Sequence, residues 1–134
     1  MVRPASVLLE RPIAMARDHR KLRVFQLADA LVPAIYDVTR SFPPEERFGL
    51  QTQLRRAAIS VASKIVEGSA RRSTREYVNF LNMANGSAAE ALYLLDLAHR
   101  LTMLRDGDLA RLVTQYSQVS RGLQAMIKGF AGAD

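Results

Sequence analysis

A run of basic side chains between residues 55 and 75 is the feature of this sequence most suited to chemistry. Six basic residues stand there against the single acidic residue Glu67, which gives the segment a net charge of +5. The six are Arg55, Arg56, Lys64, Arg71, Arg72 and Arg75. Of the 19 basic residues in the chain, 16 are arginine, whose planar guanidinium can donate two parallel hydrogen bonds to a phosphate or a carboxylate. The segment therefore predicts either anion binding or ion pairing within the protein.

We expect the arginines to divide between these two roles. On a helix, Arg55 would project from within the apolar face, where a guanidinium is best explained by a carboxylate partner. The candidate partners are Glu67, Glu76 and Glu90, either in the same subunit or across a subunit boundary. Four other arginines are predicted to contact nucleic-acid phosphates, with a solvated surface turn as the alternative. They are Arg56 on the polar side of its helix and Arg71, Arg72 and Arg75 around the start of the next helix, where the helix dipole attracts anions.

Patterns of catalytic or metal-binding residues are missing from the sequence. There is no cysteine, and the only two histidines, His19 and His99, lie far apart in the chain. Neither a Glu-x-x-His nor a His-x-x-x-His pair occurs, and there is no nucleophile elbow or glycine-rich phosphate loop. We therefore expect a protein that is not an enzyme and that needs no metal and no cofactor.

Length and composition are typical of one globular domain. The chain has 134 residues, of which 49% are hydrophobic and 24% charged. No apolar run approaches the roughly 20 residues that span a bilayer, and charges at Glu10 and Arg11 interrupt the apolar N-terminal residues too early for a signal peptide. We therefore expect a cytoplasmic protein. Residues 1–21, which have no sustained apolar period, predict a mobile basic arm before a domain at 22–134.

Apolar residues recur at spacings of three and four along four stretches, which predicts four long helices. We place these helices at 22–41, 45–67, 73–104 and 106–130. Pro33 should kink or divide the first helix, and Gly68 should cap the second in a left-handed conformation. Ser73 and Glu76 form a capping box at the start of the third, and Asp106 is the expected N-cap of the fourth. Four helices with short connections predict an all-α, antiparallel up-down bundle.

The second and third helices carry more apolar surface than one bundle buries. The second has an apolar arc of roughly 200°, and the third is apolar nearly all round in its second half. We therefore expect a homo-oligomer with Leu94 and Leu97 in the subunit interface. Asn79, Asn82 and Asn85 recur every three residues on the third helix and predict a polar seam between subunits or a ligand contact. Gly86 should permit a close helix crossing.

The order and spacing of short motifs in the chain match a known pattern. The matching residues are Phe42-Pro43, Phe48-Gly49-Leu50, Gln53-Leu54-Arg55-Arg56-Ala57-Ala58, Ser60-Val61, Glu67-Gly68, Arg72-Ser73, Glu76, Phe80-Leu81, Gly86-Ser87 and Glu90. In these positions the chain resembles the four helix bundle protein family encoded by intervening sequences in bacterial large-subunit ribosomal RNA genes. That family is similar in fold to the accessory variability determinant of diversity-generating retroelements, a pentameric barrel with a basic surface that partners a reverse transcriptase and nucleic acid. The resemblance implies a homo-oligomeric bundle, with a pentamer as the expected ring, that contacts RNA, DNA or a protein that handles them.

Two functions from different classes are compatible with these features. The first is a non-enzymatic homo-oligomer that binds the nucleic-acid backbone through Arg56, Arg71, Arg72 and Arg75 without reading bases. The alternative is a structural adaptor whose ring docks a protein partner, with the arginines serving subunit pairing. Phosphate binding weakens steeply with salt whereas docking of an apolar surface does not, so salt dependence separates the two.

Overall fold

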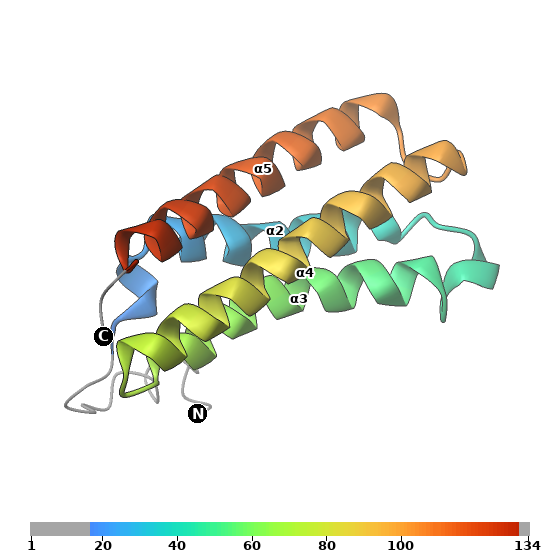
Figure 1. Cartoon of the computed structure of the whole chain (residues 1–134). Coiled ribbons are helices and arrows are strands. Elements are labelled where there is room, and N and C mark those ends of the chain that lie inside the picture. Colours follow the sequence, from blue (N-terminus) through green and yellow to red (C-terminus); the bar gives the residue numbers. More distant parts are fainter. Residues whose placement is uncertain (1–16, 132–134) are drawn as a thin grey trace, which may run out of the picture.

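Four long helices and two short 3-10 helices make up the structure, a computed structural model that describes residues 17–131 (Figure 1). In chain order the elements are η1 (His19–Lys21), α2 (Arg23–Thr39), η2 (Pro44–Glu46), α3 (Leu50–Ser69), α4 (Thr74–Arg100) and α5 (Asp106–Gly129). Each long helix packs against the next, and α5 returns to pack against α2. No strand is present among these residues. The predicted all-α, antiparallel up-down bundle is confirmed.

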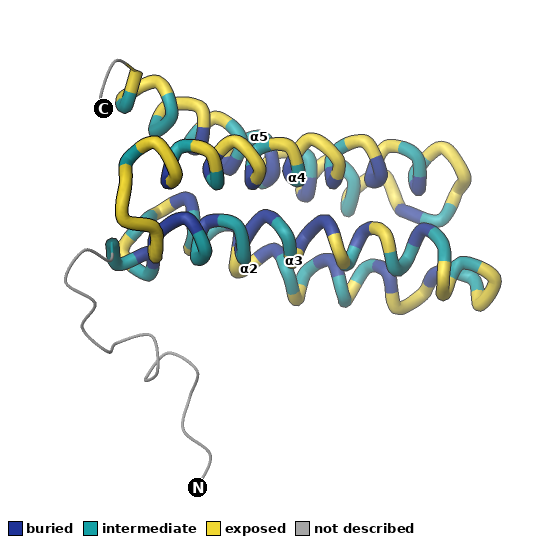
Figure 2. Tube along the Cα trace, turned by 60° about the horizontal axis from the view of Figure 1, so that its bottom comes forward, coloured by how far each residue is buried: buried dark blue, intermediate teal, exposed yellow. Residues whose placement is uncertain are grey.

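The core forms where the apolar stripes of the four helices face one another, as the buried inner sides of the tubes in Figure 2 show. The α2 stripe illustrates the helical period, with Val24, Ala28, Leu31 and Ile35 buried at successive turns. The buried faces of α3 and α4 are instead rich in alanine: Ala57, Ala58, Ala62, Ala84, Ala88 and Ala91. Small side chains let two helices approach closely, and α3 and α4 share the most extensive contact in the bundle.

The ends of the helices confirm one predicted cap and correct two others. Ser73 is the N-cap of α4, and its Oγ accepts a hydrogen bond from the Glu76 amide at 3.0 Å. The predicted left-handed cap at Gly68 is wrong, because Gly68 lies inside α3 and the right-handed Ala70 caps that helix. Asp106 is the first residue of α5 rather than its N-cap, which is the extended Arg105. In the first turn the negative charge of Asp106 suits the helix dipole.

The first two predicted helices also differ in detail from the structure. Pro33 does not divide α2, which runs unbroken from Arg23 to Thr39. Pro33 and Asp29 are both exposed, so the carbonyl that loses its amide partner can bond to water instead. The acidic residues expected to start the second helix form η2, and α3 begins later, at Leu50. The carboxylate of Glu46 accepts a hydrogen bond from the Leu50 amide at 3.0 Å and so caps α3 from outside.

The chain between Arg17 and Lys21 is packed on the bundle. The Arg17 amide donates to the Ser69 carbonyl at 3.0 Å, which ties this segment to the end of α3. His19 is buried and meets the ring of Phe25 edge to face, with ring centroids 4.8 Å apart. The last five residues of the predicted arm, 17–21, therefore belong to the folded structure. The remainder of that arm, 1–16, lies outside the described residues.

Candidate nucleic-acid interface

Three basic segments that are distant in the sequence meet at one end of the bundle (Figure 1). They are residues 17–23 with the start of α2, residues 64–76 with the turn between α3 and α4, and residues 121–131 with the end of α5. Together they hold ten basic and three acidic side chains, which is a net charge of +7. The rest of residues 17–131 holds seven basic and eight acidic side chains. The positive charge of the described chain is thus concentrated at this end, which we call the basic end.

Two cations at the basic end lie over the ring of Phe80. The guanidinium carbon of Arg71 is 4.7 Å from the ring centroid, and the Lys64 ammonium is 5.8 Å from it. Lys64 also pairs with Glu67, with 3.3 Å between Nζ and Oε2. Stacking on an aromatic face fixes the plane of a guanidinium and leaves its N–H edges available to an anion. Arg71 is therefore held in place without a carboxylate.

Arg17 is a member of the basic end that the sequence did not single out. Its guanidinium carbon lies 4.2 Å from the centroid of the Tyr77 ring. Nη1 donates to the Arg71 carbonyl at 3.3 Å, and Nη2 donates to the Thr74 hydroxyl at 3.5 Å. Arg17 therefore joins the chain before α2 to the turn between α3 and α4. The only sequence signal for it was the net charge of the segment before α2.

Arg72 and Arg75 are exposed at the start of α4, beside Arg71. Arg75 lines a shallow hollow of about 670 Å³ together with Asn79 and Asn82, which were predicted to form a subunit seam or to contact a ligand. Within residues 17–131 no carboxylate forms an ion pair with Arg71, Arg72 or Arg75. The structure thus brings three of the four predicted phosphate-binding arginines together and places the two asparagines on the same helix.

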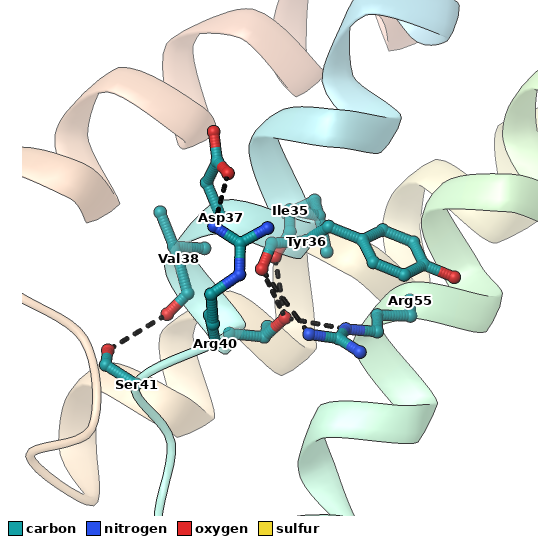
Figure 3. A network of polar contacts seen from close by, with 8 residues as sticks. Ile35, Tyr36, Asp37, Val38, Arg40, Ser41 and Arg55 are labelled. Atoms are coloured by element: carbon teal, nitrogen blue, oxygen red, sulfur yellow. Dashed lines mark hydrogen bonds and ion pairs between the residues drawn. The ribbon is translucent and has the colours of Figure 1, made fainter.

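The fourth predicted phosphate-binding arginine, Arg56, and the predicted ion-pairing residue Arg55 lie elsewhere on α3. Arg56 is exposed but precedes the end of α3 by thirteen residues, about 20 Å along the helix. Arg55 turns toward α2, where its Nε donates to the hydroxyl of Thr39 at 2.9 Å and its Nη2 to the carbonyl of Tyr36 at 3.4 Å (Figure 3). Its guanidinium carbon also lies 4.3 Å from the centroid of the Tyr36 ring. Neither arginine is part of the basic end.

The predicted ion pairs of Arg55 with Glu67, Glu76 or Glu90 do not form within the described chain. A buried hydroxyl, a carbonyl and an aromatic face take the place of the carboxylate as its partners. Glu67 pairs with Lys64, one turn before it on the same helix. Glu76 and Glu90 are exposed on α4. A pairing of Arg55 with a glutamate of another subunit stays a prediction.

The apolar side chains assigned to the subunit interface lie mostly inside the subunit. Leu94 is only 7% exposed and belongs to the core, so its predicted place in an interface is corrected. Leu97 is half-buried and packs against the same core. The large apolar side chains of α4 that do reach the surface are Met83 and Tyr93, followed by Leu101 at its C-cap. The hydrophobic period alone did not distinguish these from their buried neighbours.

The chemistry available at the basic end is that of anion binding. Burial raises the pKa of Tyr77, while the Arg17 guanidinium over the ring and the Ser69 side chain offset part of that rise, so Tyr77 remains a neutral phenol. Between Arg17 and Ala131, no group of three or more His, Cys, Asp or Glu side chains is placed to hold a metal ion. None of the helices in that range is long and apolar enough to cross a membrane.

Comparisons with known proteins agree with the fold. A family model described as 23S rRNA-intervening sequence protein matches residues 20–125. Among solved structures, the chain is similar to a protein of unknown function from the S23 ribosomal protein family of Bacteroides thetaiotaomicron. The two share 21% sequence identity and a TM-score of 0.74, over 78% of this chain and 98% of the other. A comparison with curated proteins finds no match.

Proposed function

The chain belongs to the 23S rRNA-intervening sequence protein family, and we propose that it is a non-enzymatic helical bundle whose basic end binds the nucleic-acid backbone. The observation that carries this proposal is the net charge of +7 gathered from three separate segments at one end of the bundle. Arg71, Arg72 and Arg75 stand there without carboxylate partners among residues 17–131. Unpaired guanidinium groups in a positive field are suited to phosphate oxygens.

Binding at this end would be driven by the release of counterions from the phosphates. Each phosphate that an arginine neutralises frees condensed cations, so affinity falls as salt rises. The aromatic rings at the basic end are engaged within the protein: Phe80 stacks with Arg71 and Lys64, Tyr77 is buried, and the half-buried Phe130 meets the Tyr77 ring edge to face. With these rings engaged, contacts there are restricted to the backbone. The family description names a 23S rRNA intervening sequence, so RNA is the first ligand to test.

We also infer that copies of the chain associate, which would multiply the phosphate contacts that one assembly makes. Support comes from Met83 and Tyr93, large hydrophobic side chains that α4 exposes at 37% and 58%. A soluble helix exposes few such groups unless another surface covers them. Asn79 and Asn82 are exposed on the same helix and suit the polar edge of such a contact.

Fluorescence anisotropy with labelled RNA, titrated at several salt concentrations, tests the proposal. The variant replaces Arg71, Arg72 and Arg75 with glutamine, which removes three phosphate contacts without adding negative charge. We expect the slope of log affinity against log salt to fall in magnitude by about 2 to 3, since each lost contact removes roughly 0.7 to 0.9.

The matched control replaces Arg100, Arg105 and Arg111 with glutamine, at the opposite end of the bundle. It removes the same charge, so a general electrostatic effect would weaken RNA binding equally in both variants. We expect the control to bind like the wild type. If the first variant keeps wild-type affinity and slope, the basic end is not the binding surface. Binding of a protein partner that is indifferent to salt would then favour the adaptor function instead.

A further inference from the structure

A second arginine-rich surface lies at the opposite end of the bundle, where the chain passes from α2 to α3. A hollow of about 460 Å³ opens there. Its lining includes Arg40, Arg47, Arg55, Phe48, Gln51 and Thr52, and we call it the Phe48 hollow. Within the described chain no acidic residue contributes to the lining. Three arginines and an aromatic ring thus share one open cavity.

Phe48 is the most exposed large hydrophobic side chain among residues 17–131, at 87%. The guanidinium carbon of Arg47 lies 5.6 Å from the centroid of its ring. At this exposure, the ring face opposite Arg47 meets solvent. Phe48 contributes nothing to the core, and an aromatic ring presented in this way is suited to a stacking contact with a planar ligand.

The turn that carries Phe48 is held firmly. Glu46 binds both residues that follow the ring: its carbonyl accepts from the Gly49 amide at 3.1 Å, and its carboxylate accepts from the Leu50 amide at 3.0 Å. The hydroxyl of Thr52 donates to the Arg47 carbonyl, which ties the turn to the first turn of α3. The ring is therefore presented from a fixed backbone. The conformation of this turn determines how far the Phe48 ring is exposed.

Arg55 also lines the hollow. Contacts with α2 orient its guanidinium before any ligand arrives (Figure 3). Its Nε and Nη2 donate to Thr39 and to the carbonyl of Tyr36. The hydroxyl of Thr39 in turn donates to the Ile35 carbonyl at 2.7 Å, so its lone pair is directed at Arg55. These bonds leave Nη1 without a partner among the described residues. A guanidinium fixed in this way binds a phosphate at little cost in side-chain entropy.

We propose that the Phe48 hollow binds one unstacked nucleotide of a single-stranded RNA, with its base on the ring of Phe48 and its phosphate between Arg47 and Arg55. The proposal rests on the function proposed above and extends it, because the basic end offers no free aromatic ring. A strand that reached both ends would follow α3, whose 20 residues span about 30 Å. A fully paired duplex keeps its bases stacked and cannot use the ring. The hollow therefore makes the protein prefer single strands.

The first test uses the absence of tryptophan from the chain. A Phe48→Trp variant carries one tryptophan at the hollow, and stacking of a base on the indole quenches its fluorescence. We expect unstructured single-stranded RNA to quench this variant and a paired RNA duplex to leave it unchanged. The control is Thr114→Trp, an exposed site on α5, which should not respond to either RNA. No quenching of Phe48→Trp by bound single-stranded RNA overturns the proposal.

The second test measures affinity with Phe48→Leu, an exposed substitution that leaves the core untouched. Loss of one base–aromatic stack should weaken single-stranded RNA binding about 5- to 150-fold and leave duplex binding unchanged. Phe48→Tyr, which keeps the ring, should retain wild-type affinity. If Phe48→Leu and the wild type bind single strands with equal affinity, the Phe48 hollow is not an RNA-binding site. The glutamine variant of Arg71, Arg72 and Arg75 reports on the basic end separately, so either site can fail while the other stands.

Discussion

At the scale of single residues, Tyr116 buries a polar hydroxyl that the surrounding residues do not satisfy. Its side chain is completely buried in α5, and its hydroxyl has no hydrogen-bond partner among the described residues. Burial also raises the pKa of this phenol, so the hydroxyl keeps its proton and its unmet hydrogen-bonding capacity. A buried hydroxyl without a partner costs about 1 to 3 kcal/mol.

We predict that Tyr116→Phe stabilises the protein. Removing the hydroxyl removes its desolvation cost, and the free energy of unfolding in urea should rise by about 1 kcal/mol. Thr39→Val is the matched control, because the Thr39 hydroxyl is also buried but donates to the Ile35 carbonyl at 2.7 Å. That variant should lose at least about 1 kcal/mol. A stability loss in Tyr116→Phe as large as in Thr39→Val would mean that the Tyr116 hydroxyl has a partner after all.

The candidate site was only partly predictable from its residues. Arg71 and Arg72 fall within one short connection between two strong helical periods and Arg75 lies at the start of the second, so their clustering followed from the sequence. The partners of Arg55 could not be predicted from the sequence, because Thr39 and Tyr36 come from another helix and only packing brings them close. Phe48 belongs to the motifs that match the family, but its exposure could not be predicted from the sequence, since a single phenylalanine near a helix start is usually buried.

At the scale of helices, the two glycines Gly68 and Gly86 have opposite surroundings. A Cβ at Gly68 would lie 2.8 Å from the Cβ of Phe80 and 3.2 Å from Cδ1 of Tyr77. A Cβ at Gly86 would meet nothing within 4 Å inside the subunit. The close helix crossing that the sequence placed at Gly86 is therefore at Gly68, where α3 meets α4.

We predict that alanine at these two positions shifts stability in opposite directions. Inside a helix, alanine is normally favoured over glycine by about 1 kcal/mol. The free energy of unfolding of Gly86→Ala should rise by most of that amount. That of Gly68→Ala should fall by about 1 to 3 kcal/mol, because α3 and α4 must move apart to make room for the new methyl group. Urea denaturation of both variants at equal protein concentration measures the difference. If Gly68→Ala is as stable as Gly86→Ala, the close approach of α3 and α4 is not tight.

The helices themselves followed from the hydrophobic period, but their ends did not. A stripe repeated over five or more turns, as in α5, outweighs local preferences and fixes the element. The end of a helix depends instead on a few hydrogen bonds. The Leu50 amide, for example, donates to the Glu46 carboxylate, and α3 begins at Leu50, after η2. The effect of Pro33 could not be predicted from the sequence for a similar reason. Whether a helix continues through a proline depends on its surroundings, and Pro33 is exposed in an unbroken α2.

At the scale of the whole molecule, topology turns scattered charges into one surface. In an up-down bundle of four helices, the start of the first, the turn between the second and third and the end of the fourth all lie at the same end. The segments 17–23, 64–76 and 121–131 occupy these three places and sum to +7. The sequence showed two of these segments as separate basic stretches. Only the fold shows that the end of α5 lies beside them, so that the three segments together produce one positive electrostatic field.

Self-association is the prediction that belongs to this scale. Along the exposed side of α4, Tyr93, Leu97 and Leu101 follow one another at intervals of four residues, the spacing of a helix face that meets another helix. Tyr93 and Leu101 are 58% and 49% exposed in the isolated subunit. If a second copy covers this face, light scattering should give a mass several times 14.9 kDa. Glutamate at both Tyr93 and Leu101 should then yield a helical monomer.

The control for that experiment is Leu94→Glu, which lies one residue beyond Tyr93. Leu94 is 7% exposed inside the bundle, so a charge there is buried without a partner and should unfold the subunit. Circular dichroism separates the two effects: the surface variant keeps its helical signal while it loses mass, and the core variant loses the signal itself. A wild-type mass of one subunit would refute the association, and the +7 of a single basic end would then have to bind RNA alone.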